Sequence, residues 1–192
     1  SESMFKWDKK KSKLLYKSYF KLNIFLEKKI VESSKFSVAA GGQLVEKYSN
    51  FNSPSFATSP RMTLKMSDIY ERKDTCDKSI INLVNVGGLI HDKDQNNLMK
   101  SFQLAYLKNK NLRLNIIGDG PEKNNLQNLA NELGIAECVD FLGYVESEKE
   151  LFNYLRSFDI FVLSSVTEGF PRVLYESMTS RLPIVTTNVG GI

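Results

Sequence analysis

The two stretches IINLVNVGG (residues 80–88) and LRLNIIGDGP (residues 112–121) decide the fold. Each is a short, largely apolar run that stops at glycines, which predicts a buried strand entering a tight loop. Between them, Leu98, Phe102 and Ala105 recur at helical spacing. A strand, a helix and a strand in this order predict parallel strands joined by a right-handed crossover.

The same alternation of strand and helix continues towards residue 186. Ser147 and Glu150 have the spacing of a helix capping box, Gly134 stands where a helix should end, and Pro171 predicts the first position of a helix. The sequence therefore predicts an α/β fold, a Rossmann-like parallel sheet flanked by helices. Such sheets bind ligands at the carboxyl ends of their strands, which here are followed by four loops: Gly87–Lys93, Gly118–Pro121, Gly143–Val145 and Ser164–Pro171.

The first 79 residues have a different character. Residues 1–50 place Leu15, Tyr19, Leu22, Leu26 and Ile30 on one helical face, followed by a short strand (36–40) and a short helix (43–48). We interpret residues 1–50 as the tail of an N-terminal α/β domain. Residues 51–79 are polar and have the composition of loop and extended chain, so we interpret them as an interdomain linker. Residues 80–192 are then a ligand-binding domain that is incomplete at its C-terminus. Both ends read as cut, so we expect a fragment of a larger protein.

Composition excludes several classes of protein. With 42% hydrophobic and 25% charged residues, the 192-residue chain is globular rather than disordered. Residues 1–30 hold nine lysines and three acidic residues (+6), so the net charge of +4 leaves −2 for the rest, which argues against nucleic acid as a partner. Cys76 and Cys138 stand far apart without metal-ligand spacing, so we expect no metal and a cytoplasmic protein.

Two readings of the lysine-rich segment 9–30 stay open. It could be a peripheral contact with the inner face of an anionic membrane, or a solvated helix whose apolar side packs on its own domain.

The segment EGFPRVLYE (residues 168–176) carries the most chemistry. Glu168 follows a strand, Glu176 lies in the next helix, and Gly169 permits close approach of a ligand to the backbone. The helix N-terminus offers free N–H groups suited to a diphosphate. The alternative from spacing alone is that both glutamates are exposed residues near a helix start.

Five motifs in order resemble those of family-4 retaining glycosyltransferases of the GT-B type. Beside E-x7-E, these are VGGLIHDK (86–93), IIGDGP (116–121), VDFLGY (139–144) and PIVTTNVGG (183–191). The resemblance covers residues 80–192 and implies transfer of a sugar from a nucleotide-diphosphate sugar to a glycan or lipid-linked acceptor, in the synthesis of surface polysaccharide, without a cofactor or bound metal. The fragment alone is expected to be inactive, because the acceptor half of the cleft is largely missing.

The resemblance also implies roles for individual residues. Glu168 and Lys93 would be catalytic, Glu168 by holding hydroxyls of the donor sugar and Lys93 by neutralising charge on the leaving diphosphate. Glu176 would bind the ribose, and Tyr144 and Val145 would lie near the base. The other donor-binding residues it implies are Gly87, Gly88, Gly118, Asp119, Gly120, Gly169, Phe170, Pro171 and Arg172.

One departure from the family pattern leaves alternatives open. Gly88 stands where the family often has an arginine that contacts the diphosphate; Arg172 is a candidate substitute, and His91 is either a phosphate contact or an exposed loop residue. The competing functions are a non-catalytic nucleotide-sugar-binding subunit and a sugar-nucleotide epimerase of the same fold. A dinucleotide site at Gly118 and Gly120 is disfavoured, because Lys123 occupies the place of the third glycine.

Overall fold

The computed structural model describes residues 9–40, 42–51, 53–58, 64–65, 68–73, 76, 78–169 and 171–189, without the side chains of residues 9–17, 20, 40, 42–43 and 58. The chain divides into two compact units, Ser1–Ser59 and Pro60–Ile192. The tail, linker and domain boundaries proposed from sequence stay predictions. Phe170 and the Gly190–Gly191 pair lie outside the described residues.

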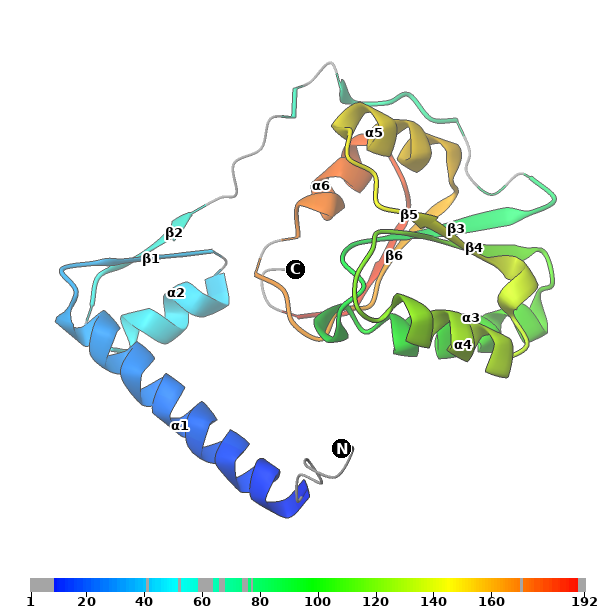
Figure 1. Ribbon diagram of the computed structural model, residues 1–192. Helices are drawn as coiled ribbons and strands as arrows, with labels where there is room; N and C mark the ends of the chain where they lie inside the picture. Colours follow the sequence, from blue (N-terminus) through cyan, green and yellow to red (C-terminus); the bar gives the residue numbers. More distant parts are fainter. Residues whose placement is uncertain are drawn as a thin grey trace. The chain divides into compact units, whose positions relative to one another are not determined.

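The first unit is a small α/β piece (Figure 1). Helix α1 (Lys9–Ser33) leads into strand β1 (Ser37–Ala40), helix α2 (Gly42–Ser49) and strand β2 (Ser55–Thr58). The strand β2 differs from the sequence interpretation, which took this segment as loop and extended chain. Its four residues show no apolar alternation of their own, and they become a strand by pairing in parallel with β1, from Ser37–Ser55 to Ala40–Thr58.

The second unit contains a five-stranded parallel sheet, as predicted. Its strands are β3 (Ile81–Val86), β4 (Leu112–Ile117), β5 (Val139–Gly143), β6 (Ile160–Leu163) and β7 (Ile184–Thr186). They lie in the order β5-β4-β3-β6-β7, and every neighbouring pair is parallel. The chain therefore builds outward from β3 in one direction and then returns to build from β3 in the other.

Helices cover both faces of this sheet (Figure 1). Helices α3 (Gln95–Lys108) and α4 (Lys123–Glu132) lie on one face, and α5 (Glu148–Ser157) and α6 (Arg172–Thr179) lie on the other. Each face has its own apolar core. Met99, Phe102 and Leu126 belong to the first core, and Leu155, Phe161 and Leu174 to the second. Burial on both faces explains why the strands read as apolar runs rather than as alternating patterns.

Small differences concern helix ends. Pro171 is the N-cap of α6, with extended backbone (ψ 107°), rather than its first helical residue as predicted. Phe158 is the C-cap of α5. Ser147 caps α5 as predicted, its side chain accepting a hydrogen bond from the Glu150 N–H. None of the helices in the described part of the chain is long and apolar enough to cross a membrane.

Candidate functional site

The candidate site lies at the carboxyl edge of the sheet, where the chain changes direction. Strands β3 and β6 are neighbours, but their connecting helices go to opposite faces of the sheet. Backbone pairing between them joins Leu83 with Ile160 and Val84 with Phe161, and beyond it the Asn85 amide donates to the Val162 carbonyl at 2.8 Å. Open parallel sheets bind ligands in the crevice at such a switch point.

An ion pair joins the two loops that leave this point. Lys93, in the short 3-10 helix His91–Lys93 after β3, has its Nζ 2.5 Å from Oε1 of Glu168, in the loop after β6. The Ser165 hydroxyl donates to the same carboxylate oxygen at 2.6 Å. The Glu168 side chain is only 8% exposed. The two residues to which the family resemblance gave catalytic roles, 75 positions apart, thus lie in direct contact.

Further hydrogen bonds hold these loops in place. The Ser164 hydroxyl donates to the Lys93 carbonyl at 2.8 Å, and the Val166 N–H donates to the Asp92 carbonyl at 3.0 Å. After β7, the Thr187 hydroxyl donates to the Ser165 carbonyl at 2.6 Å. The ion pair is therefore positioned by backbone contacts on both sides, which limits the conformational entropy lost when a ligand binds.

The glycine loops after β3 and β4 pack against one another. The Leu89 N–H donates to the Asp119 carbonyl, and the Gly118 N–H donates to the Gly143 carbonyl of β5. A Cβ on Gly118 would lie 1.9 Å from the Gly87 carbonyl oxygen, so only glycine fits there. Gln95, which is buried, donates from its amide to the Gly88 carbonyl at 3.1 Å.

A cavity of about 430 Å³ opens beside these loops, between the N-terminal ends of α5 and α6. Its walls include the predicted residues Gly87, Gly88, Lys93, Val145, Pro171, Arg172 and Glu176, together with Val86, Glu146, Ser147, Glu148, Leu151 and Val173. A second cavity of about 300 Å³ continues from the same glycines and is lined by Gly118, Asp119, Tyr144, Val145 and Leu151. Because the two share Gly87, Gly88 and Val145, an elongated ligand can occupy both.

Glu176 is the buried one of the three glutamates that line the 430 Å³ cavity. Its side chain is 11% exposed and lies 3.8 Å from the guanidinium of Arg172. Burial raises the pKa of Glu176; the positive charge of Arg172 opposes that rise, and the negative charge of Glu148 adds to it. A buried carboxylate with unused acceptor capacity suits a ligand that brings hydroxyl donors.

Several predicted residues have a different setting. Tyr144 is 73% exposed and Gly169 is open, so neither is tightly packed. The N–H of Gly120 and the side chain of Lys123 lower the pKa of Asp119, which acts as a turn residue. The His91 side chain is 92% exposed beside Asp92. Glu168, Gly169 and Gly120 line neither of these two cavities. Glu168 does contact Lys93, which lines the 430 Å³ cavity.

The structure also shows residues that sequence reasoning missed. Ser165 and Thr187 hold the Glu168 loop; they lie in the predicted loop Ser164–Pro171 and in the motif of residues 183–191, but neither was assigned a role. Ser147 and Glu148 line the cavity, and the capping box signalled only the helix start there. Among the described residues, no three histidine, cysteine, aspartate or glutamate side chains gather as a metal site would require.

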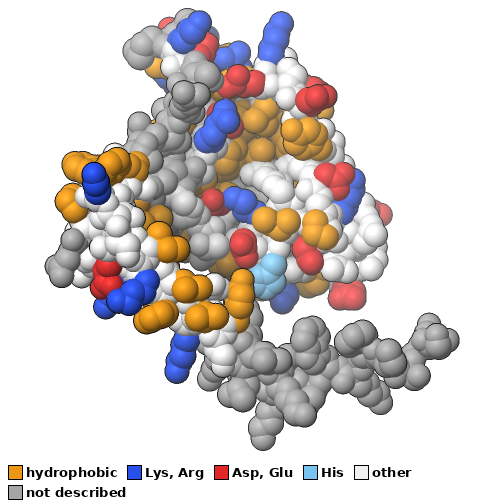
Figure 2. All heavy atoms as spheres, turned by 60° about the vertical axis from the view of Figure 1, so that its left-hand side comes forward, with side chains coloured by type: hydrophobic (Ala, Val, Ile, Leu, Met, Phe, Trp, Pro, Cys, Tyr) orange, Lys and Arg blue, Asp and Glu red, His pale blue; other side chains and the backbone are white. Residues whose placement is uncertain are grey.

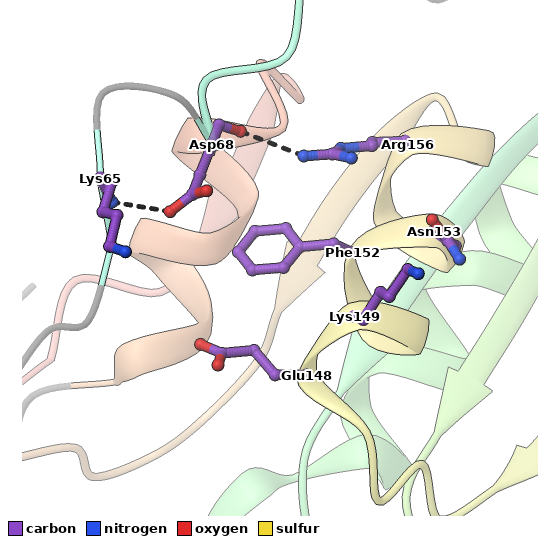
Figure 3. Close-up of a pocket in the computed structure, with 7 residues that line it drawn as sticks. All are labelled: Lys65, Asp68, Glu148, Lys149, Phe152, Asn153 and Arg156. Atoms are coloured by element: carbon purple, nitrogen blue, oxygen red, sulfur yellow. Dashed lines mark hydrogen bonds between the residues drawn. The ribbon is translucent and has the colours of Figure 1, made fainter.

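A larger cavity of about 700 Å³ lies away from the sheet edge, between α5 and the segment around Lys65 and Asp68 (Figure 3). From α5 it is lined by Glu148, Lys149, Phe152, Asn153 and Arg156. Only Glu148 is shared with the cavity beside the glycine loops. Size alone therefore does not identify the site; the convergence of loops, charges and glycines does.

The fold and the site define a class: an α/β protein with a switch-point cleft suited to a phosphorylated, hydroxyl-bearing ligand. The chain belongs to the family described as glycosyl transferases group 1, whose model matches residues 68–192. The predicted family and the GT-B fold are both confirmed.

Relatives by sequence match only part of this chain and a smaller part of their own length. An uncharacterised glycosyltransferase of Methanocaldococcus jannaschii is 37% identical over 105 residues, covering 55% of this chain and 25% of the relative. Protein CapJ of Staphylococcus aureus is 29% identical over 99 residues, covering 52% and 25%. The chain spans about a quarter of the length of these curated relatives.

Solved structures agree on the fold. Staphylococcus aureus TarM, crystallised with UDP, superposes with a TM-score of 0.71 at 17% identity, covering 85% of this chain and 32% of its own. Anabaena HepE in complex with UDP gives 0.64 at 17% identity, covering 82% and 46%.

Proposed function

We propose that this chain forms the donor side of a retaining glycosyltransferase and binds a nucleotide-diphosphate sugar in the two joined cavities. One observation carries the proposal: at one switch point the chain gathers a buried carboxylate (Glu176), a cation (Lys93) and a backbone edge of glycines. The carboxylate would accept hydrogen bonds from a ribose hydroxyl, the cation would bind a diphosphate, and the backbone edge of glycines would lie against a base. Tyr144 and Val145 at the smaller cavity would flank the base.

Lys93 and Glu168 would carry the chemistry. In the transfer, the bond between the sugar carbon and the diphosphate oxygen breaks and a bond from the acceptor oxygen to that carbon forms. The acceptor proton goes to the departing diphosphate, on the same face of the sugar. Lys93 would neutralise the charge that develops on the diphosphate, and Glu168 would accept hydrogen bonds from sugar hydroxyls. Arg172, which lines the same cavity as Gly88, would supply the second cation.

The comparisons favour a uridine diphosphate sugar as the first ligand to test. Among the neighbours in fold, TarM, GtfA and HepE were each crystallised with UDP. Another neighbour, WaaG, is described as a glycosyltransferase involved in lipopolysaccharide biosynthesis. These likenesses support a role in building surface polysaccharide.

The deciding experiment is calorimetric binding of UDP, GDP and ADP to the complete protein. We expect one nucleotide to bind, and Glu176→Ala to weaken its binding about 10-fold, as expected for hydrogen bonds between ribose hydroxyls and a carboxylate. Glu132→Ala, at an exposed position on α4, is the matched control and should bind like wild type. Absence of binding from a folded wild-type protein would overturn the proposal.

Turnover separates the competing functions. A protein that binds the nucleotide but transfers no sugar to any acceptor would fit the non-catalytic subunit, for which Gly88 is the best support. Conversion of the donor to its epimer without an acceptor would identify the isomerase.

A second proposal concerns where the protein works. On α1 a stripe of apolar side chains is exposed: Tyr19 (64%), Leu22 (53%), Leu26 (46%) and Ile30 (67%). Lysines 21, 28 and 29 lie on the same helix, and apolar and basic side chains share the surface of this unit (Figure 2). We propose that α1 rests on the anionic inner face of the cytoplasmic membrane, where a lipid-linked acceptor would lie.

Sedimentation with vesicles tests this membrane contact. The protein should bind phosphatidylcholine vesicles that contain phosphatidylglycerol and not vesicles of phosphatidylcholine alone. Binding should be lost in Lys21→Glu/Lys28→Glu. Equal binding of that variant would exclude an electrostatic contact through α1.

A further inference from the structure

Arg72 lies outside the two joined cavities of about 430 and 300 Å³. It connects α5 and α6, the two helices that frame the 430 Å³ cavity. The guanidinium of Arg72, in the segment before β3, donates to four carbonyl oxygens. It contacts Phe158 at 2.8 Å, and Leu155, Arg156 and Ser180 at 3.1 Å each. The Tyr70 N–H adds a contact to the Thr179 carbonyl at 2.8 Å.

These four carbonyls belong to the C-terminal ends of α5 and α6. Leu155 and Arg156 lie in the last turn of α5, Phe158 is its C-cap, and Ser180 is the C-cap of α6. The last carbonyls of a helix have no partner within it and carry partial negative charge, so a cation there is favourable. A planar guanidinium can satisfy both helix ends at once because its donors form a rigid fork, which an ammonium lacks.

A second arginine reinforces the contact from α5. Arg156 donates to the Asp68 carbonyl at 3.1 Å, as Figure 3 shows. The Arg156 guanidinium lies 5.3 Å from the centre of the Tyr70 ring, and the Arg72 guanidinium lies 5.6 Å from it. Residues 68–72 therefore run as a strap across the C-terminal ends of both helices.

The opposite ends of the same helices form the walls of the 430 Å³ cavity. Val145 to Glu148 and Leu151 line it from the start of α5, and Pro171 to Val173 and Glu176 line it from α6. The spacing of α5 and α6 thus sets the width of the cavity. Within the described residues, Leu155 on α5 and Leu174 on α6 belong to the buried apolar core beneath this pair.

We propose that Arg72 is a positioning residue for the nucleotide: by tying together the C-terminal ends of α5 and α6, it fixes the separation of the cavity walls at their N-terminal ends. The inference rests on the proposed nucleotide site. Loss of the fork loosens both helices together, which displaces Glu176 from Gly88 and the α5 wall.

Two measurements on Arg72→Lys and Arg72→Gln in the complete protein test this. For nucleotide affinity and donor KM, we expect about a 10-fold loss with kcat changed less than about two-fold, because uniform binding is weakened rather than the chemical step. For backbone hydrogen exchange, we expect faster exchange at Glu150–Leu151 and at Leu174–Glu176, which lie near the cavity, as well as at the helix ends that Arg72 contacts.

Two controls separate positioning from general destabilisation. Phe102→Leu weakens the core on the other face of the sheet, and Arg113→Lys removes arginine contacts to Asp140 and to the Glu137 carbonyl. Even where a control variant loses as much melting temperature as the Arg72 variants do, its donor KM should stay at the wild-type value.

The proposal is overturned if Arg72→Lys keeps the wild-type KM and exchange rates, or if faster exchange is confined to residues 154–158 and 178–182. Hydrogen exchange needs no nucleotide. A wild-type protein that binds none would therefore sink the proposed function while the exchange result still decides the role of Arg72.

Discussion

Two glycine-containing loops lie side by side at the carboxyl edge of the sheet, and the space around their glycines differs. In the loop after β4, a Cβ on Gly118 would lie 1.9 Å from the Gly87 carbonyl oxygen, and one on Gly120 would lie 2.5 Å from the Leu89 carbonyl oxygen. In the loop after β3, a Cβ on Gly88 would meet no described atom within 4 Å. The first kind of glycine permits two backbones to touch, and the second leaves room beside a cavity.

This difference changes how the sequence motif is understood. Gly118, Asp119 and Gly120 were all expected to bind the donor, yet the glycines there are required by the neighbouring loop whether or not a ligand is present. Gly88, which departs from the family pattern, is the position where a Cβ would meet no described atom within 4 Å. The comparison leads to four predictions, in order of decreasing expected effect.

The largest effect is expected from Gly118→Ala. The added methyl would overlap the Gly87 carbonyl, and the backbone of Gly118 has φ +143°, which L-residues rarely adopt. We expect the melting temperature to fall by about 10 °C, since clashes with buried backbone are among the costliest substitutions. Gly88→Ala should shift it by no more than about 2 °C. Differential scanning calorimetry of both variants measures this, and equal melting temperatures would contradict the comparison.

A smaller effect concerns the ion pair that connects the loop after β3 to Glu168. Lys93→Met should lower the melting temperature by about 5 °C, because it leaves the nearly buried Glu168 carboxylate without its cation. Adding Glu168→Gln should recover part of that loss, since the unpaired charge is then removed as well. A double-mutant cycle of melting temperatures gives the coupling. Simple additivity of the two substitutions would show that the pair contributes no coupling energy in solution.

The alternation of strands and helices along the chain could be predicted from sequence, because the apolar runs of β3, β4 and β5 end at glycines and the start of α5 carries a capping box. The contacts that complete the site could not. Lys93 and Glu168 are 75 positions apart, and only the resemblance placed both in one site. Arg72 lies in a polar segment whose composition reads as linker, and nothing local distinguishes it from Arg61 or Lys73. Strand β2 likewise exists only through pairing with β1.

The third prediction uses the open space at Gly88. Gly88→Arg should tighten binding of the nucleoside diphosphate about 10-fold, because a charge-assisted hydrogen bond to phosphate is added at a position where a Cβ meets no described atom within 4 Å. Binding of the corresponding nucleoside, which lacks the diphosphate, should not change. Gly88→Gln is the uncharged control, and the gain should shrink at high salt. If Gly88→Gln tightens binding equally, charge is not what the position lacks.

The smallest effect is expected at Glu176, which lines the same 430 Å³ cavity as Gly88. Burial raises the pKa of Glu176 above its ordinary value of 4.5. The folded protein therefore holds this proton more tightly than the unfolded chain does. Its contribution to stability is present in acid and is lost as the pH rises through the folded-state pKa.

Glu176→Gln imitates the protonated carboxyl group at every pH. Near neutral pH the variant should melt slightly above wild type, by a few degrees at most, and the difference should vanish as the pH falls below the ordinary pKa of a glutamate. Nucleotide affinity should fall at the same time, as expected where a binding group is retained at a cost in stability. Glu132→Gln, at an exposed position, should change neither quantity. A variant that melts below wild type at neutral pH would show that Arg172 stabilises the Glu176 carboxylate more than burial destabilises it, and that the cavity beside Gly88 is already balanced in charge without a ligand.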